Sequence, residues 1–204
     1  MKQPFLKHGI AALGLLVAVG AAGASDYTTI LTGPNEAPPN TSGAIGAAKI
    51  SFDMSSHTLV VNAAFAGLMG DSTASHIHCC TASPGAGTAP VATELPSFTG
   101  FPLGVGTGGY SHTFDTSLAS SWNPSFVSGN GGTTAGAEAA LNAGLMSGSA
   151  YLNIHSTEYP GGEIRGFLHP LTAVPEPAGF ALLAAGIPVV VLARRRQKAR
   201  QDRA

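Results

Sequence analysis

The segment from Ala150 to His169, AYLNIHSTEYPGGEIRGFLH, limits the folds open to this chain more than any other stretch. Apolar and polar residues alternate in two short runs separated by a Pro-Gly-Gly break, which is the pattern of two half-buried strands joined as a hairpin. Only one parity of register places both apolar sets on the same face. The cross-strand pairs that this parity predicts are His155 with Glu163, Asn153 with Arg165, and Tyr151 with Phe167.

Further strand candidates, separated by turn-forming residues, run along residues 27–32, 44–53, 58–65, 75–80 and 110–116. Residues 134–146 break this pattern, because the segment is rich in alanine and carries Leu141 and Leu145 four positions apart. With Thr134 as N-cap and Gly148 as terminator, it is predicted to form a short surface helix. The pattern as a whole predicts an all-β domain, either a sandwich or a Greek-key barrel, with one short helix.

The first 24 residues have the composition of a secretory signal. Lys2 and Lys7 precede an apolar run over residues 10–22, and Ala22-Gly23-Ala24 supplies a small-x-small cleavage motif. A membrane anchor is the alternative, but the apolar run is short for a span. We therefore expect cleavage before Ser25 and export of the domain over residues 25–173.

The opposite end, residues 174–204, has three parts in a fixed order. An uncharged apolar stretch over residues 178–193 would span about 24 Å as a helix, and its flanking residues can extend it across a hydrocarbon core of about 30 Å. This predicts a transmembrane helix with its basic tail, residues 194–204, on the cytoplasmic side. The residues that flank the apolar stretch as a motif are Val174, Pro175, Glu176, Pro177, Arg194, Arg195 and Arg196.

This order of Pro-Glu-Pro motif, apolar stretch and basic tail resembles the PEP-CTERM sorting signal of Gram-negative bacteria. The resemblance implies recognition by an exosortase and removal of the tail. It also implies transient anchoring in the inner membrane, followed by delivery to the cell envelope, the surface or an exopolysaccharide matrix. An ordinary single-pass anchor is the alternative.

The domain between the two ends is acidic. Residues 25–173 contain nine aspartates and glutamates but only two basic residues, Lys49 and Arg165, for a net charge of −7. This balance argues against a nucleic-acid partner, since binding to phosphates needs lysine and arginine. The chain has neither a Gly-x-Ser-x-Gly elbow nor a phosphate-binding loop, so the sequence assigns no catalytic residue and favours a non-enzymatic protein.

Three histidines are the candidate metal ligands. His76 and His78 stand two apart on a predicted strand and therefore share a face, and His155 lies on the polar face of another strand. Imidazole nitrogens suit copper and zinc. Glu163, predicted opposite His155, is a candidate fourth ligand or a residue that orients His155. The alternative is that the histidines lie on a wet sheet face and bond to their neighbours.

Cys79 and Cys80 follow these histidines directly. In an exported chain thiols tend to oxidise, so one possibility is a strained disulfide between adjacent residues. Bridges between molecules, thiolate ligation beside His76 and His78, and an inert buried thiol are the other possibilities.

Three sequence blocks lie along the domain. In their order and spacing they resemble the CHRD domain first defined in chordin, over residues 27 to 168, and this resemblance implies an immunoglobulin-like β-sandwich or barrel. The resemblance implies no particular reaction, and Cys79-Cys80 departs from the glycine-containing turn expected after the histidine pair. The blocks are Asn35–Pro39, Ser75–His78, and Tyr151–His155 together with Pro160–Gly166.

Two functions are consistent with these observations. The first is a structural, adhesive or binding role for an exported, exosortase-sorted surface or matrix protein. The second is a metal-binding or redox protein that holds copper or zinc at His76, His78 and His155. The second requires the three side chains to converge on one point, whereas the first allows them to be scattered.

Overall fold

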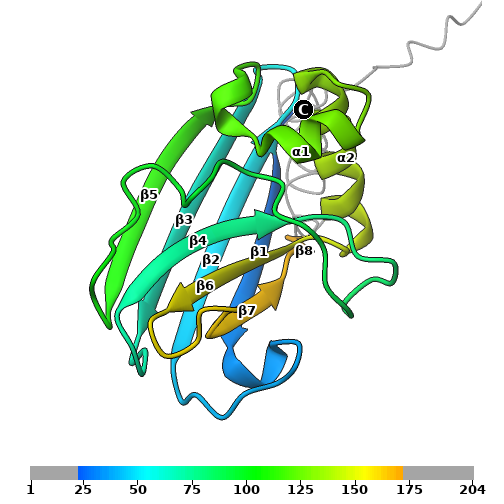
Figure 1. Ribbon diagram of the computed structural model, residues 1–204. Coiled ribbons are helices and arrows are strands. Elements are labelled where there is room, and N and C mark those ends of the chain that lie inside the picture. The colour runs from blue at the N-terminus through cyan, green and yellow to red at the C-terminus, as the bar shows by residue number, and fades with distance from the viewer. Residues whose placement is uncertain (1–22, 172–204) are drawn as a thin grey trace, which may run out of the picture. The chain divides into compact units, whose positions relative to one another are not determined.

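The computed structural model describes residues 23–171, and these residues are mostly β-sheet with few helices (Figure 1). This confirms the prediction of a predominantly β domain. The strands are β1 (Ser25–Thr32), β2 (Ile45–Asp53), β3 (Thr58–Ala66), β4 (Ser72–His78), β5 (Gly108–Asp115), β6 (Tyr151–Ser156), β7 (Ile164–Phe167) and β8 (His169–Pro170). The helices are α1 (Pro124–Gly129) and α2 (Thr134–Ser147), with short 3-10 turns η1 (Gly33–Asn35) and η2 (Ala119–Ser121).

The strands form one continuous sheet in the order β4-β6-β7-β1-β2-β3-β5, and β8 pairs with β1. The pairings among β1 to β7 are antiparallel. The sheet curls into a half-barrel, and both α-helices lie near one end of it (Figure 1). The finer expectation of an immunoglobulin-like sandwich or Greek-key barrel stays a prediction.

The register predicted for the final hairpin is confirmed where β6 and β7 pair. Tyr151 lies opposite Phe167 and Asn153 opposite Arg165. Glu163 immediately precedes β7, and its backbone N–H donates to the carbonyl of Ile154 at 2.8 Å. The alternation in the sequence therefore determined which face each hairpin residue takes.

The hydrophobic core lines the inner face of the curled sheet. β2 and β3 alternate strictly, so that Ile50, Phe52, Leu59 and Val61 point inward and are at most 3% exposed. On the other arm of the sheet the fully buried core residues include Ile77, Leu152, Ile154 and Ile164. Both arms contribute to one core cluster, which the curl of the sheet encloses on its inner face.

The predicted helix is α2, and its caps follow from local chemistry. Thr133, one residue before the predicted N-cap, accepts from the N–H of Gly136, and Gly148 ends the helix in a left-handed conformation with φ of 70°. Leu141 and Leu145 are fully buried, so one face of the helix belongs to the core. The sequence prediction missed α1, whose signals are an Asn123 cap and a proline in the first turn.

The outer face of β4, β6 and β7 is covered by two loops, residues 36–44 with the preceding turn η1, and residues 79–107. Their carbonyl groups bond to side chains on that face, for example Pro96 to His76 and Asn35 to Arg165. As a result β6 is buried on both sides, and polar residues on its outer face lie inside the protein.

The predicted signal at residues 1–24, apart from its last two residues, and the predicted sorting signal at residues 174–204 lie outside the described residues. Within residues 23–171, no helix is long and apolar enough to cross a membrane.

Candidate metal centre

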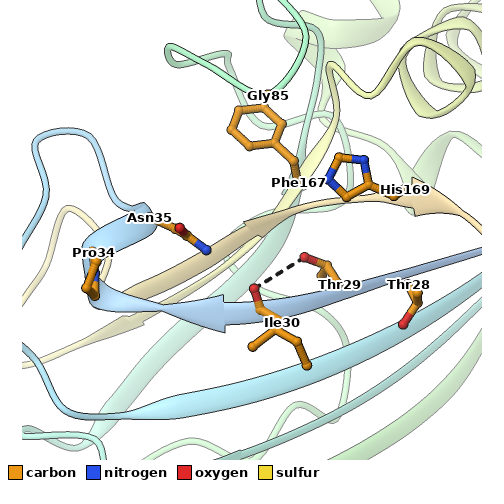
Figure 2. A pocket seen from close by; sticks show the side chains of 8 residues that line it. All are labelled: Thr28, Thr29, Ile30, Pro34, Asn35, Gly85, Phe167 and His169. Atoms are coloured by element: carbon orange, nitrogen blue, oxygen red, sulfur yellow. Dashed lines mark hydrogen bonds between the residues drawn. The ribbon is translucent and has the colours of Figure 1, made fainter.

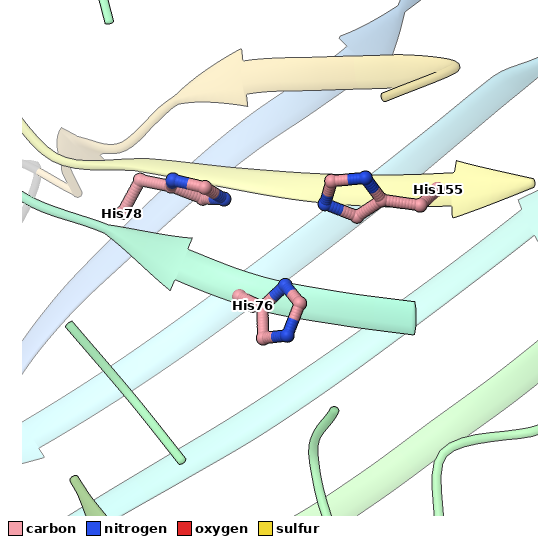
Figure 3. A group of neighbouring side chains, drawn as sticks. All are labelled: His76, His78 and His155. Carbon is pink, nitrogen blue, oxygen red and sulfur yellow. The ribbon is translucent and has the colours of Figure 1, made fainter. Parts of the chain in front are cut away.

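The three candidate histidines meet between two neighbouring strands (Figure 3). In the β4–β6 pairing, Ala74 lies opposite His155 and His76 lies opposite Asn153. His76 and His78 on β4 and His155 on β6 therefore share the outer face of the sheet. One ring nitrogen from each histidine lies within 4.8 Å of those of the other two. Two nitrogens bonded to one ion at about 2.0–2.1 Å lie at most about 4.2 Å apart, so the three rings are close enough to share an ion after a small inward movement.

Each histidine ring is oriented by a backbone carbonyl from a neighbouring loop. His76 Nε2 bonds to Pro96 O at 2.7 Å, His78 Nδ1 to Ala89 O at 2.9 Å, and His155 Nδ1 to Pro160 O at 2.9 Å. Because a carbonyl only accepts, the bonded nitrogen carries the hydrogen and the other nitrogen presents a lone pair. Metal-binding histidines are commonly oriented in this way.

The remaining nitrogens, His76 Nδ1, His78 Nε2 and His155 Nε2, are buried and have no hydrogen-bond partner. Buried polar atoms in folded proteins are almost always paired, and leaving one unpaired costs about 1–3 kcal/mol. Asn153 Oδ1 and Glu163 Oε2 also lack a protein partner. The three imidazole lone pairs form a donor set that either a metal ion or ordered water can satisfy.

Burial keeps these rings neutral. It lowers the pKa of His76 to about 4, against the opposing hydrogen bond to Pro96. It also lowers the pKa of His78 to about 4 and shifts the pKa of His155 downward. Neutral imidazole is the form that binds metals, so at neutral pH protons do not compete for the site.

A layer of aromatic and charged side chains adjoins the histidines on the same face. The ring of Tyr151 stacks on His78 with centroids 4.7 Å apart, and the guanidinium of Arg165 lies 4.8 Å from the Tyr151 centroid. Arg165 is buried and donates to the carbonyls of Asn35 and Gly87. It is therefore a fixed positive charge one ring away from His78.

Glu36 and Asn153 complete this layer. Asn153 Nδ2 donates to Glu36 Oε1 at 2.6 Å, and Glu36 Oε2 lies 3.8 Å from Arg165 Nε. Burial raises the pKa of Glu36 to about 7, although the charge of Arg165 opposes the shift. The sequence blocks contain both residues, but no spacing rule pairs residue 36 with residues 153 and 165, so their contact was not predicted.

Glu163, the candidate fourth ligand, does not belong to the histidine group. Its Oε1 accepts from Ser42 Oγ at 2.6 Å and from the N–H of Met69 at 2.7 Å. The carboxylate thus ties two loops to the start of β7. The structure brings together His76, His78 and His155, but not Glu163.

Cys79 and Cys80 are joined to each other by a disulfide, across a cis peptide bond. Of the possibilities open from the sequence, the structure has the bridge between adjacent residues. Neither sulfur is a free thiolate, so the cysteines do not add to the histidine ligands. Both sulfurs lie against the backbone of α2 at Gly144.

A separate surface pocket of about 700 Å³ lies between β1 and the end of β7 (Figure 2). It combines one aromatic ring, Phe167, with hydroxyl, amide and imidazole groups. The ring of Phe167 also packs against the guanidinium of Arg165 and the ring of Tyr151. The lining residues are Thr28, Thr29, Ile30, Pro34, Asn35, Gly85, Phe167 and His169.

The fold and this site define a class: a curled antiparallel β domain with a buried three-histidine centre between two strands. Residues 27–168 match the CHRD domain, and the chain belongs to that family. No match was found among curated proteins. Solved structures likewise gave no match.

Proposed function

We propose that this chain is an exported metal-binding protein that holds copper or zinc at His76, His78 and His155. The observation that carries the proposal is the convergence of three imidazoles that have ring nitrogens within 4.8 Å of one another and that each carry one buried nitrogen without a protein partner. A purely structural histidine cluster would pair these atoms with protein donors or ordered water. Nothing in the proposal requires catalysis.

The test is the metal content of the full chain, expressed with its own export signal and purified without chelators. We expect close to one equivalent of copper or zinc in the parent and none in the His76→Ala/His78→Ala variant. The exposed His169 gives a matched control, since His169→Ala should retain the metal. A parent that stays metal-free after reconstitution with both metals would refute the proposal.

We propose further that the chain is exported, engages the membrane through the helix over residues 178–193, and is sorted by an exosortase to the envelope, surface or matrix. The charge pattern of residues 1–24 and the order of motifs in residues 174–204 support this. In a host with an exosortase, the intact mass of the mature chain should correspond to a polypeptide that begins at Ser25 and lacks the basic tail. Retention of the tail would favour an ordinary anchor.

A second role, binding of exopolysaccharide, is favoured by the pocket of Figure 2. Sugar rings pack on aromatic faces and bond to surrounding polar groups, and this pocket offers Phe167 beside Asn35 and His169. Retention of the chain on immobilised host exopolysaccharide should fall at least about fivefold in Phe167→Ala. Met69→Ala, which truncates an exposed side chain outside the pocket, is the control. Equal retention of both variants and parent would refute this role.

A further inference from the structure

The donor set of the histidine site carries no charge. The described residues that could together hold an ion there are three neutral imidazoles, without a carboxylate or thiolate among them. Glu163 is held by Ser42 and Met69 through Oε1, and Glu36 pairs with Asn153 and Arg165. The protein therefore supplies three nitrogen ligands to the ion and no charged ligand.

A fixed positive charge stands close to the same site. Arg165 packs over Tyr151, which stacks directly on His78. Glu36, whose Oε2 lies 3.8 Å from Arg165 Nε, offsets part of this charge. The charged group that adjoins the histidine layer through Tyr151 is thus an arginine, and the site is shielded from solvent.

These two features act differently on ions of different valence. The cost of burying an ion grows with the square of its charge, and repulsion from Arg165 grows linearly with it. A divalent ion held by three neutral nitrogens takes a further ligand, such as a water that it polarises, and keeps a higher net charge in the buried site than a monovalent copper ion with the same neutral donors. The geometry itself, three nitrogens around one point, suits either ion.

We infer that the three-histidine site is built to hold copper as Cu(I) in preference to the divalent ions Cu(II) and Zn(II). This inference rests on the proposed metal-binding function and specifies its ion. Valence selection follows from the neutral donors of β4 and β6 together with the buried guanidinium of Arg165.

The decisive experiment changes the charge at the site without touching a ligand. Ala74 lies directly opposite His155 in the β4–β6 pairing, on the histidine face, and is partly exposed. Ala74→Asp therefore places a carboxylate beside the site, and Ala74→Asn places an uncharged side chain of the same shape. Ala74→Glu and Ala74→Gln repeat the comparison with a longer side chain if the first pair folds poorly, as judged by circular dichroism.

Affinities are measured on the full chain in a neutral detergent. Bicinchoninate competes for Cu(I) under anaerobic reducing conditions, and chromophoric chelators compete for Zn(II) and Cu(II). We expect the parent to bind Cu(I) at least about 100-fold more tightly than Zn(II). The carboxylate should raise the affinity for Zn(II) relative to Cu(I) by at least about tenfold, and the amide should leave the ratio within about threefold.

Several results would overturn the inference. If the parent binds Zn(II) or Cu(II) as tightly as Cu(I), or if the carboxylate and amide variants shift the ratio equally, the site does not select by valence. In those cases the proposed metal-binding function still stands. If the parent binds none of the three ions, the proposed function itself fails, so the two failures are distinguishable.

Discussion

At the scale of single residues, the two basic side chains of the domain have very different surroundings. Arg165 is 4% exposed and pairs with buried Glu36, whereas Lys49 pairs with Asp26 at 2.8 Å with both side chains substantially exposed. Removing one partner of a buried pair leaves an uncompensated charge, while an exposed pair contributes little.

We therefore predict that Arg165→Met lowers the free energy of unfolding by about 3–5 kcal/mol, and that Lys49→Met lowers it by less than about 1 kcal/mol. Urea denaturation followed by circular dichroism measures both. Similar losses in the two variants would show that Glu36 and the loop carbonyls do not depend on the guanidinium.

Gly144 of α2 is required by its contact with the disulfide. A Cβ at this position would overlap Cys79 Sγ and lie 2.6 Å from Cys80 Sγ. Gly144→Ala should lower the free energy of unfolding by about 1–3 kcal/mol, although alanine favours a helix by about 1 kcal/mol. Thermal unfolding of this variant is compared with Gly109→Ala, where an added Cβ meets no atom within 4 Å. An unchanged or higher melting temperature in Gly144→Ala would contradict the packing argument.

At the scale of secondary-structure elements, α2 is attached to the sheet through a buried carboxylate. Glu138 is 2% exposed; it accepts from Thr116 Oγ1 and lies 2.9 Å from Nδ1 of His57 in the β2–β3 turn. The hydrogen bond and then the charge of Glu138 raise the pKa of His57 above 6.5.

A pH dependence follows from this contact. Because the pKa of His57 is higher in the folded than in the unfolded state, its stabilising effect is complete below pH 6.5 and is lost as the pH rises through the folded-state value. The melting temperature of His57→Gln should therefore lie below that of the parent in acid, with the gap narrowing by about pH 9. Parallel curves for the two proteins would contradict this.

The elements also show how far sequence reasoning reached. The alternation of apolar and polar residues predicted the β6–β7 register, and an alanine-rich segment between two capping residues predicted α2, because both signals are local. The alternation also assigned His76, His78 and His155 to polar strand faces, but it could not show that β4 lies next to β6. That adjacency depends on chain topology, as does the contact of Glu36 with Asn153, which are 117 residues apart.

At the scale of the whole molecule, β4 and β6 come from distant parts of the chain and pair only in the folded sheet. The segment between them, residues 79–150, contains β5 and both α-helices. The three nitrogens therefore converge only in the folded state. An ion held there stabilises the folded protein by mass action and cannot bind the unfolded chain with the same geometry.

We accordingly predict that loading the metal-free chain with a bound ion at about 100 times its dissociation constant adds about 2.7 kcal/mol to the free energy of unfolding. For a domain of this size this corresponds to a rise of roughly 5–10 °C in melting temperature. Calorimetry of the parent with and without metal gives the shift, and His155→Ala should abolish it while His169→Ala retains it. A shift that persists in His155→Ala would place the bound ion elsewhere, because removing one of three converging donors leaves no site on β6.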